Sequence, residues 1–371
     1  MKTYLVTATD SAGRRDTFGR EAASVEHLRA MLELQGYTNI EFVDDEISAT
    51  LRTQRPDGGR PRSRHELQLE AKLRKGPATA ALWLAAIRSN AVLLTVLAAT
   101  AAYGLWTRSP WWFGTGAVLL VGWALLVRAG LRAGAAYDRL LRACAEGDWP
   151  AAEELIERIS RSSAAKGNAQ LQEDLVFRRA ALLARSGHLE QALALVEPLR
   201  DSPHGANGMF ENRVASVYYV ADRQAEFLEC MRRSYEQSGN SQPMQLDLAF
   251  ALARVGDIAE AGALLRGIER RNLSDLHQAV ALLADGICAR RSGAAQEACD
   301  QLARACEGLS AYAKNPAVWP VLGIAYANRA LALAALGRKA DARTELAEWR
   351  AVADASLDGD ARRLVQTHVF G

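Results

Sequence analysis

The sequence predicts a mainly α-helical protein with a small N-terminal ββαβ domain, a two-helix transmembrane hairpin and a C-terminal α-solenoid of stacked helical hairpins. Three observations predict this. Residues 76–133 contain no Asp or Glu and four Arg. Residues 134–371 are rich in Ala, Leu, Glu and Arg, which favour helix, and they repeat a short phrase every 34 to 44 residues. Residues 1–50 instead contain β-prone stretches separated by turn residues.

The small acidic domain comprises residues 1–50, with five Lys or Arg against nine Asp or Glu. Residues 4–8 and 17–19 are β-prone, and residues 10–13 supply turn chemistry between them. Ser24 is expected to cap a helix that stops at Gly36, and residues 40–43 form the last strand. The predicted order is therefore ββαβ.

This segment resembles the ββαβ module at the start of inner-membrane platform proteins of type II secretion and type IV pilus assembly. The resemblance covers residues 3–46 and lies in Tyr4, Ala8, Asp10, Gly13, the Ala23-Ser24 helix start and the Leu34-Gln35-Gly36-Tyr37 helix end. It implies an alternative function for the chain, as a component of an envelope secretion or pilus assembly system.

Residues 51–77 are predicted to form a basic linker and a short helix. Residues 51–75 carry eight Lys or Arg against three Asp or Glu, and Ser63 to Glu66 has the spacing of a capping box. A basic segment beside a membrane span is drawn to anionic lipid. Nucleic-acid binding is the alternative, but no aromatic residues are interleaved with these charges, so no nucleic acid is expected as a partner.

The transmembrane hairpin is predicted over residues 78–133. Residues 89–107 and 109–127 are two charge-free stretches of nineteen residues, each close to the roughly 20 that a helix needs to cross a bilayer. Trp106, Trp111 and Trp112 cluster at the connecting turn, where amphipathic rings favour the headgroup level. The alternative is a buried helical hairpin in a soluble core.

Charge predicts the orientation of the hairpin. The basic flanks lie before and after the spans, whereas the turn carries Arg108 alone. The positive-inside bias therefore places both termini in the cytoplasm, and Ala/Arg-rich composition suggests a bacterial inner membrane. No apolar run opens the chain, so no cleavable secretory signal is expected. Gly114, Gly122 and the Gly130/Gly134 pair could serve the contact within the hairpin or a contact with another membrane helix.

The predicted α-solenoid of residues 134–371 rests on a recurring turn phrase. We call the first residue of each occurrence an anchor; the anchors are Gly147, Gly187, Ala221, Gly256, Gly293 and Gly337. Ala stands five residues after five of them, and a bulky aliphatic residue stands nine after the same five. Small residues also precede most anchors by seven positions. Such positions let paired helices approach closely.

This pattern resembles the tetratricopeptide repeat (TPR), a helix-turn-helix of about 34 residues. The match is best at Gly147-Asp148-Trp149-Pro150-Ala151-Ala152 and extends over residues 135–352, although the third unit lacks both the Gly and the Ala. The resemblance implies a TPR-like α-solenoid whose concave groove binds a protein or peptide. A generic helical bundle is the alternative.

In a TPR-like solenoid the first helix of each unit lines the groove. Counting back from the anchors gives the candidate partner-binding residues Phe177, Arg178, Asn212, Tyr219, Asp247, Phe250, Arg254, Arg291 and Asn328. Arg185, Arg254 and Arg291 recur two residues before an anchor, where planar donors could hold an acidic peptide. Arginine in the last turn of a helix also complements the helix dipole, which is the alternative role.

The sequence contains no motif that identifies a reaction. Five cysteines form no C-x-x-C pair, and the six histidines lack metal-ligand spacing, so neither cofactor nor metal is expected. The leading hypothesis is a non-enzymatic, membrane-anchored adaptor or scaffold whose cytoplasmic repeats bind a protein partner and whose residues 78–133 and basic flanks contact lipid. A secretion or pilus component is the second hypothesis, and an enzyme without a recognisable motif is the third. Two spans followed by repeats also resemble a bacterial membrane protein associated with haem biosynthesis.

Overall fold

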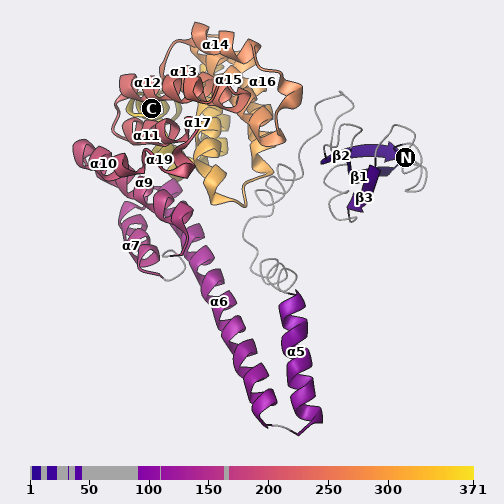
Figure 1. The fold of residues 1–371 in the computed structure, drawn as a ribbon. Helices are drawn as coiled ribbons and strands as arrows, with labels where there is room; N and C mark the ends of the chain where they lie inside the picture. The colour runs from indigo at the N-terminus through magenta and orange to yellow at the C-terminus, as the bar shows by residue number, and fades with distance from the viewer. Residues whose placement is uncertain are drawn as a thin grey trace.

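The computed structural model describes residues 2–9, 15–22, 32, 38–43, 91–108, 110–162 and 167–371 of the chain. The described part is mainly helical (Figure 1). The predicted linker of residues 51–77 lies outside the described residues.

Three strands form an antiparallel sheet near the N-terminus. They are β1 (Lys2–Thr9), β2 (Arg15–Ala22) and β3 (Thr38–Val43), in the spatial order β2-β1-β3. Val6 on the central strand pairs with Phe18 on one side and Phe42 on the other. The helix expected between β2 and β3 lies outside the described residues except for Leu32, which is helical and, like Val6, fully buried.

The remaining described elements are helices. Their bounds are α5 (Ala91–Trp106), α6 (Pro110–Glu146), α7 (Trp149–Ser160), α9 (Ala169–Arg185), α10 (Leu189–Val196), η1 (Glu197–Leu199), η2 (Pro203–Gly205), α11 (Met209–Val220), α12 (Gln224–Gln237), α13 (Gln242–Val255), α14 (Ile258–Arg266), η3 (Arg270–Asn272), α15 (Asp275–Arg291), α16 (Ala295–Ser310), η4 (Pro316–Val318), α17 (Trp319–Ala335), α18 (Lys339–Ala347), α19 (Arg350–Ser356), α20 (Gly359–Val365) and η5 (Gln366–Phe370).

Every anchor of the repeated phrase lies at the turn between two packed helices. This gives six helix pairs: α6–α7, α9–α10, α11–α12, α13–α14, α15–α16 and α17–α18. Gly147, Gly187, Gly293 and Gly337 have φ between 79° and 89°, the left-handed conformation that ends a helix without strain only at glycine. In the third pair Asp222 takes this conformation, with φ of 58°. The predicted turns are therefore found between the helices of all six pairs, but in the third pair the left-handed residue lies one position after the expected anchor Ala221, and in the fourth pair Gly256 has φ of −115°.

Small residues lie where the paired helices approach. The five Ala that stand five residues after an anchor are fully buried: Ala152, Ala192, Ala261, Ala298 and Ala342. The aliphatic residues nine after an anchor are buried with them: Ile156, Val196, Leu265, Leu302 and Leu346. In the third pair the expected position, Glu226, lies at the surface beside Arg223; counted from the left-handed Asp222, the equivalent buried residues are Phe227 and Met231. Burial of both sets gives one apolar core running through pairs two to six and a smaller one between α6, α7 and α9.

The two predicted spans correspond to α5 and to the first half of α6, which pack side by side. Residues before Ala91 lie outside the description. The sequence places a division between residues 133 and 134, but α6 runs without interruption from Pro110 to Glu146 and supplies the first helix of pair one. The hairpin is thus joined to the helix pairs through a continuous helix, from which it projects (Figure 1).

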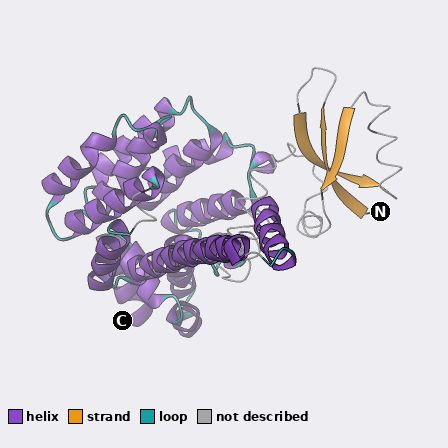
Figure 2. Ribbon diagram, turned by 60° about the horizontal axis from the view of Figure 1, so that its bottom comes forward, coloured by secondary structure: helices purple, strands orange, loops and turns teal. Residues whose placement is uncertain are grey.

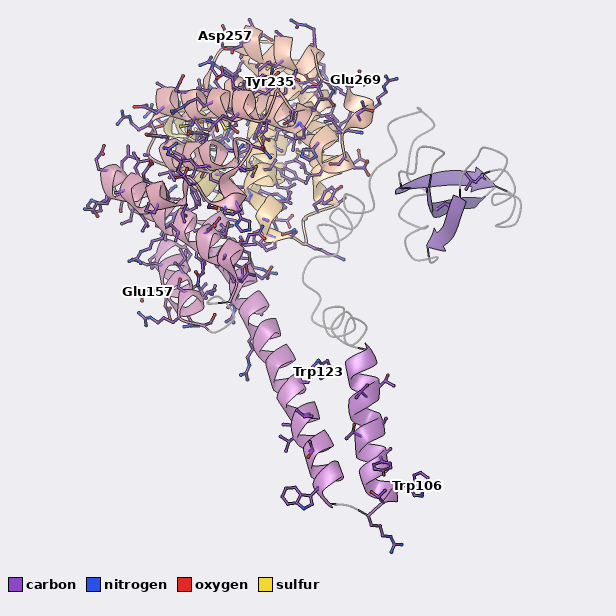
Figure 3. All side chains as sticks on the ribbon, viewed as in Figure 1. Trp106, Trp123, Glu157, Tyr235, Asp257 and Glu269 are labelled. Carbon is purple, nitrogen blue, oxygen red and sulfur yellow. The ribbon has the colours of Figure 1, made fainter. Side chains whose placement is uncertain are left out.

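The hairpin and the helix pairs differ in what they expose. Among the described residues, seven of the nine exposed large hydrophobic side chains belong to α5 and α6, and Trp106 and Trp111 are over 80% exposed. Figure 3 shows Trp106 at the turn end of the hairpin. By length and composition within the described residues, one helix, Pro316–Ala335, could cross a membrane, but most of it is buried against other helices. That helix is the core helix of pair six.

The helix pairs follow a curved path that closes on itself. First helices of neighbouring pairs pack on each other, as in α9–α11, α13–α15 and α15–α17, whereas second helices pack on the first helix of the next pair. The first helices therefore line the inner face of the curve. At the end of the curve, η4, α17 and α19 contact α6 of pair one, and the Arg142 guanidinium lies 5.5 Å from the centre of the Trp319 ring. Figure 2 shows the resulting compact arrangement of helices.

Two glycine substitutions distinguish close helix packing from helix propensity. A Cβ at Gly286 in α15 would lie 2.6 Å from Cγ of the buried Leu302, so Gly286→Ala is expected to destabilise the protein by about 1–3 kcal/mol. A Cβ at Gly262 in α14 meets only the flexible Arg266 guanidinium, so Gly262→Ala is expected to stabilise by about 0.5–1 kcal/mol. Chemical unfolding in detergent measures both. Equal stability of the two variants would contradict the packing described for pair five.

Candidate functional site

The partner-binding residues expected from the sequence fall on or beside the inner face, where each contacts other residues of the chain. Arg178 on α9 donates through Nε to Asp174 Oδ2 at 2.7 Å and through Nη2 to the Tyr137 hydroxyl at 3.2 Å. Tyr137 on α6 donates to the same carboxylate oxygen at 2.6 Å. Burial lowers the pKa of Arg178, but Asp174, Tyr137 and Cys144 together outweigh this effect and raise the pKa above its usual range. This cluster fixes α6 against α9.

A pocket of about 240 Å³ opens beside this cluster. It is lined by Tyr137, Asn168, Gln170, Leu171, Asp174 and Arg213. The Arg213 guanidinium lies 5.1 Å from the ring centre of the buried Phe177, which in turn makes an edge contact with Phe210. Within the described residues, Arg213 has no carboxylate within ion-pair distance, whereas Asp174 is paired with Arg178. Arg213 is therefore the available positive charge of this pocket.

Asn212 and Asp247 meet between α11 and α13. The Asn212 Nδ2 donates to Asp247 Oδ2 at 3.3 Å and to the Met244 sulfur at 3.7 Å. Burial raises the pKa of Asp247 to about 6, and the Asn212 hydrogen bond offsets only part of this effect. A carboxyl with this pKa changes charge near neutral pH. Asn212, expected to hold a peptide backbone, is engaged by a neighbouring helix in this conformation.

Tyr219, Phe250 and Arg254 form a third cluster. The Arg254 guanidinium lies 4.2 Å from the Tyr219 ring centre and 5.2 Å from that of Phe250. Tyr219 donates its hydroxyl and Arg254 its Nη2 to the carbonyl oxygen of Ser356, at 3.1 and 3.3 Å. Burial raises the pKa of the Tyr219 hydroxyl, so it stays a hydrogen-bond donor at neutral pH. Two predicted groove residues thus converge on a backbone carbonyl of the chain itself.

The remaining candidates have internal roles in this conformation. Arg291 donates through Nη1 to the carbonyls of Leu252 and Ala253 in the last turn of α13, at 3.3 and 2.8 Å, where a cation complements the helix dipole. Asn328 is 6% exposed, accepts from Arg290 Nε at 3.0 Å and donates to the Ile324 carbonyl at 2.8 Å. Arg185 stacks 4.1 Å from the Trp149 ring centre. The three recurring arginines therefore do not form one ladder.

The cysteines are free thiols, and burial raises the pKa of Cys306 to about 12. Among the described residues, no group of three His, Cys, Asp or Glu side chains is arranged to hold a metal ion.

Residues 349–371 contribute to the inner face, although the groove residues predicted from the sequence end at Asn328. The repeat pattern ends with pair six, so nothing in the periodicity predicts where the later residues pack. The sequence does contain apolar residues in this region. Four of them are buried in the structure: Val352, Leu357, Val365 and Val369. Their spacing over two short helices does not specify which helices they contact.

No protein-family model, curated protein or solved structure matches this chain.

The pKa of Asp247 gives a testable pH dependence. Because this pKa is raised from 3.8 to about 6 on folding, the unfolded chain loses its proton at lower pH than the folded chain does. The wild type therefore loses stability as the pH rises between these two values, and the loss is complete above about pH 6. The neutral Asp247→Asn variant is expected to be about 1–3 kcal/mol more stable than wild type near pH 8. This gain should vanish near about pH 3, where Asp247 is mostly protonated in both the folded and the unfolded chain. Urea unfolding at the two pH values measures it, and a gain independent of pH would contradict this assignment.

Proposed function

We propose that this protein is a membrane-anchored adaptor whose TPR-like helix pairs bind a protein partner at the inner face. The observation that carries the proposal is the continuity of α6, which begins in a hairpin with exposed apolar side chains and ends as the first helix of pair one. A helix of this kind holds a partner-binding domain at a defined position next to a membrane. Neither the hairpin nor the helix pairs need a catalytic group for this role.

The membrane half of the proposal is supported by the side chains of the hairpin. Val96, Tyr103, Val118, Leu119 and Val121 are more than half exposed, which is costly in water and favourable in lipid. The hydroxyls of Thr100, Thr107 and Thr115 donate to carbonyls one turn earlier at 2.8 Å. Such internal bonds remove the penalty for polar groups in lipid. With the charge bias of the flanks, we propose a bacterial inner-membrane location with both termini in the cytoplasm.

The binding half is supported by the open pocket between α6, α9 and α11. Its available charge is Arg213, and its lining includes Tyr137 and the apolar Leu171, beside the fixed Arg178–Asp174 pair. This combination suits a peptide segment that carries an acidic residue next to an apolar one. The pocket lies on α6 and its neighbours, so a bound partner would be held close to the bilayer.

We propose further that residues 1–50 form the ββαβ module expected from the sequence, as a second docking surface. The three strands and the buried Leu32 support this proposal.

Photo-cross-linking in native membranes tests the proposed function. A photoreactive residue replacing Gln170 in the pocket is expected to capture a protein partner from wild-type membranes. Arg213→Glu should reduce capture at least tenfold, because it reverses the available charge of the pocket. The matched control is Arg304→Glu on α16, a second helix outside the inner face. Equal capture by the two variants, or no captured protein at all, would contradict the proposal.

A further inference from the structure

Residues 349–371, which we call the closing segment, occupy part of the inner face. Its first helix, α19, packs against α6 of pair one and α17 of pair six. The Ser356 carbonyl at its end accepts hydrogen bonds from α11 and α13, as described above. All four of these are first helices of their pairs. The closing segment therefore lies on the surface where the sequence places the partner-binding groove.

The closing segment makes apolar contacts at both ends: Val365 and Val369 are buried near its end, and its aromatic contacts lie at its start. The Trp349 ring stacks on Tyr326, with centroids 5.5 Å apart and an interplanar angle of 5°, and meets Trp319 edge to face at 6.2 Å. Val352, Ala353 and Leu357 are each at most 5% exposed. Helical peptides that bind in a groove present a similar pattern. A large aromatic residue and small aliphatic residues lie within one or two turns of the helix.

Polar contacts fix the end of α19. Tyr219 and Arg254 capture the carbonyl of Ser356, and beyond it Arg362 donates to the carbonyls of Asp354 and Leu357 at 3.0 and 2.9 Å. Carbonyls in the last turn of a helix have no partner within the helix. Tyr219 and Arg254 thus recognise a helix end rather than a particular side chain, so they would accept any peptide helix that ends at the same place.

The closing segment has little stability of its own. The helices α19 and α20 contain seven residues each, far below the roughly 12–15 at which isolated helices become marginally stable. Their order comes from contacts with α6, α11, α13 and α17. Such a segment can leave its site by local opening, without unfolding of the six helix pairs.

We propose that the closing segment is a built-in occupant of the inner face, and that a partner helix with an aromatic residue followed by small aliphatic residues displaces it. This rests on the proposed function, since it concerns regulation of the same face. Displacement also removes the contact of α19 with α6 and leaves the Arg142–Trp319 pair and η4 to join pair one to pair six. Release of the segment would therefore loosen the helix pairs from the helix that continues into the hairpin.

The test uses the full chain in detergent and, as probe, a fluorescent synthetic peptide with the sequence of residues 349–371. Wild type should bind the peptide weakly because its own segment competes. Trp349→Ala/Val352→Ala weakens the internal segment and leaves the inner face intact, so it should bind at least tenfold more tightly. Adding Tyr219→Phe/Arg254→Gln should remove that gain. The half-exposed Leu364→Ala is the matched control within the segment and should bind like wild type. A folded segment variant that binds no better than wild type would overturn the proposal.

Hydrogen exchange of the wild type tests the same proposal if the Trp349→Ala/Val352→Ala variant fails to fold. Amides of residues 350–358 are expected to exchange at least a hundredfold faster than those of α17. Equal rates would mean that the segment opens only on global unfolding, and the proposal would be wrong. The proposed function is judged separately by cross-linking in membranes: peptide exchange without a captured partner would leave the closing segment as described and refute the adaptor role.

Discussion

The structure depends on α6, a single helix whose two ends have different surroundings. The first half of α6 exposes apolar side chains such as Val118 and Leu119, while its last third buries Ala136, Leu140 and Ala143 against α7 and α9. No cap, proline or turn separates the two halves. Because an uninterrupted helix bends only gently, the position of pair one is set by the hairpin. Every later pair is stacked on pair one, directly or through its neighbours.

Closure of the curve gives the helix pairs a property that an open solenoid lacks. In an open stack each pair contacts only its neighbours. Here α17, η4 and α19 also contact α6, so the last pair supports the first. The polar residues that an open stack would present to a partner instead join neighbouring helices, as in Asn212 with Asp247 and Arg290 with Asn328. The available inner face is thus divided between the pocket near Arg213 and the site of the closing segment.

The local features of this fold could be predicted from the sequence, whereas its long-range contacts could not. Gly147 and Gly337 end helices because few other residues accept a positive φ, and Ala152 and Ala298 are small because paired helices touch there. Both constraints act within one repeat. The sequence does not predict the continuity of α6. The composition changes from apolar to charged near residue 133 because the neighbours of the helix change there, whereas its backbone stays helical. The internal partners of Tyr219 and Asn328 depend on how the curve closes, which no single repeat encodes.

Bilayer depth measured by spin labels tests most directly the central proposal, namely that α6 leaves lipid and enters the helix pairs without a break. Cysteine introduced at Val118 or at Arg139, in a background without the native cysteines, would carry the label in protein reconstituted into vesicles. The label at position 118 is expected to collide with oxygen dissolved in lipid and not with a water-soluble nickel complex, and the label at position 139 to show the reverse. Free access of the nickel complex to both positions would contradict the claim, because it would place the whole hairpin in water.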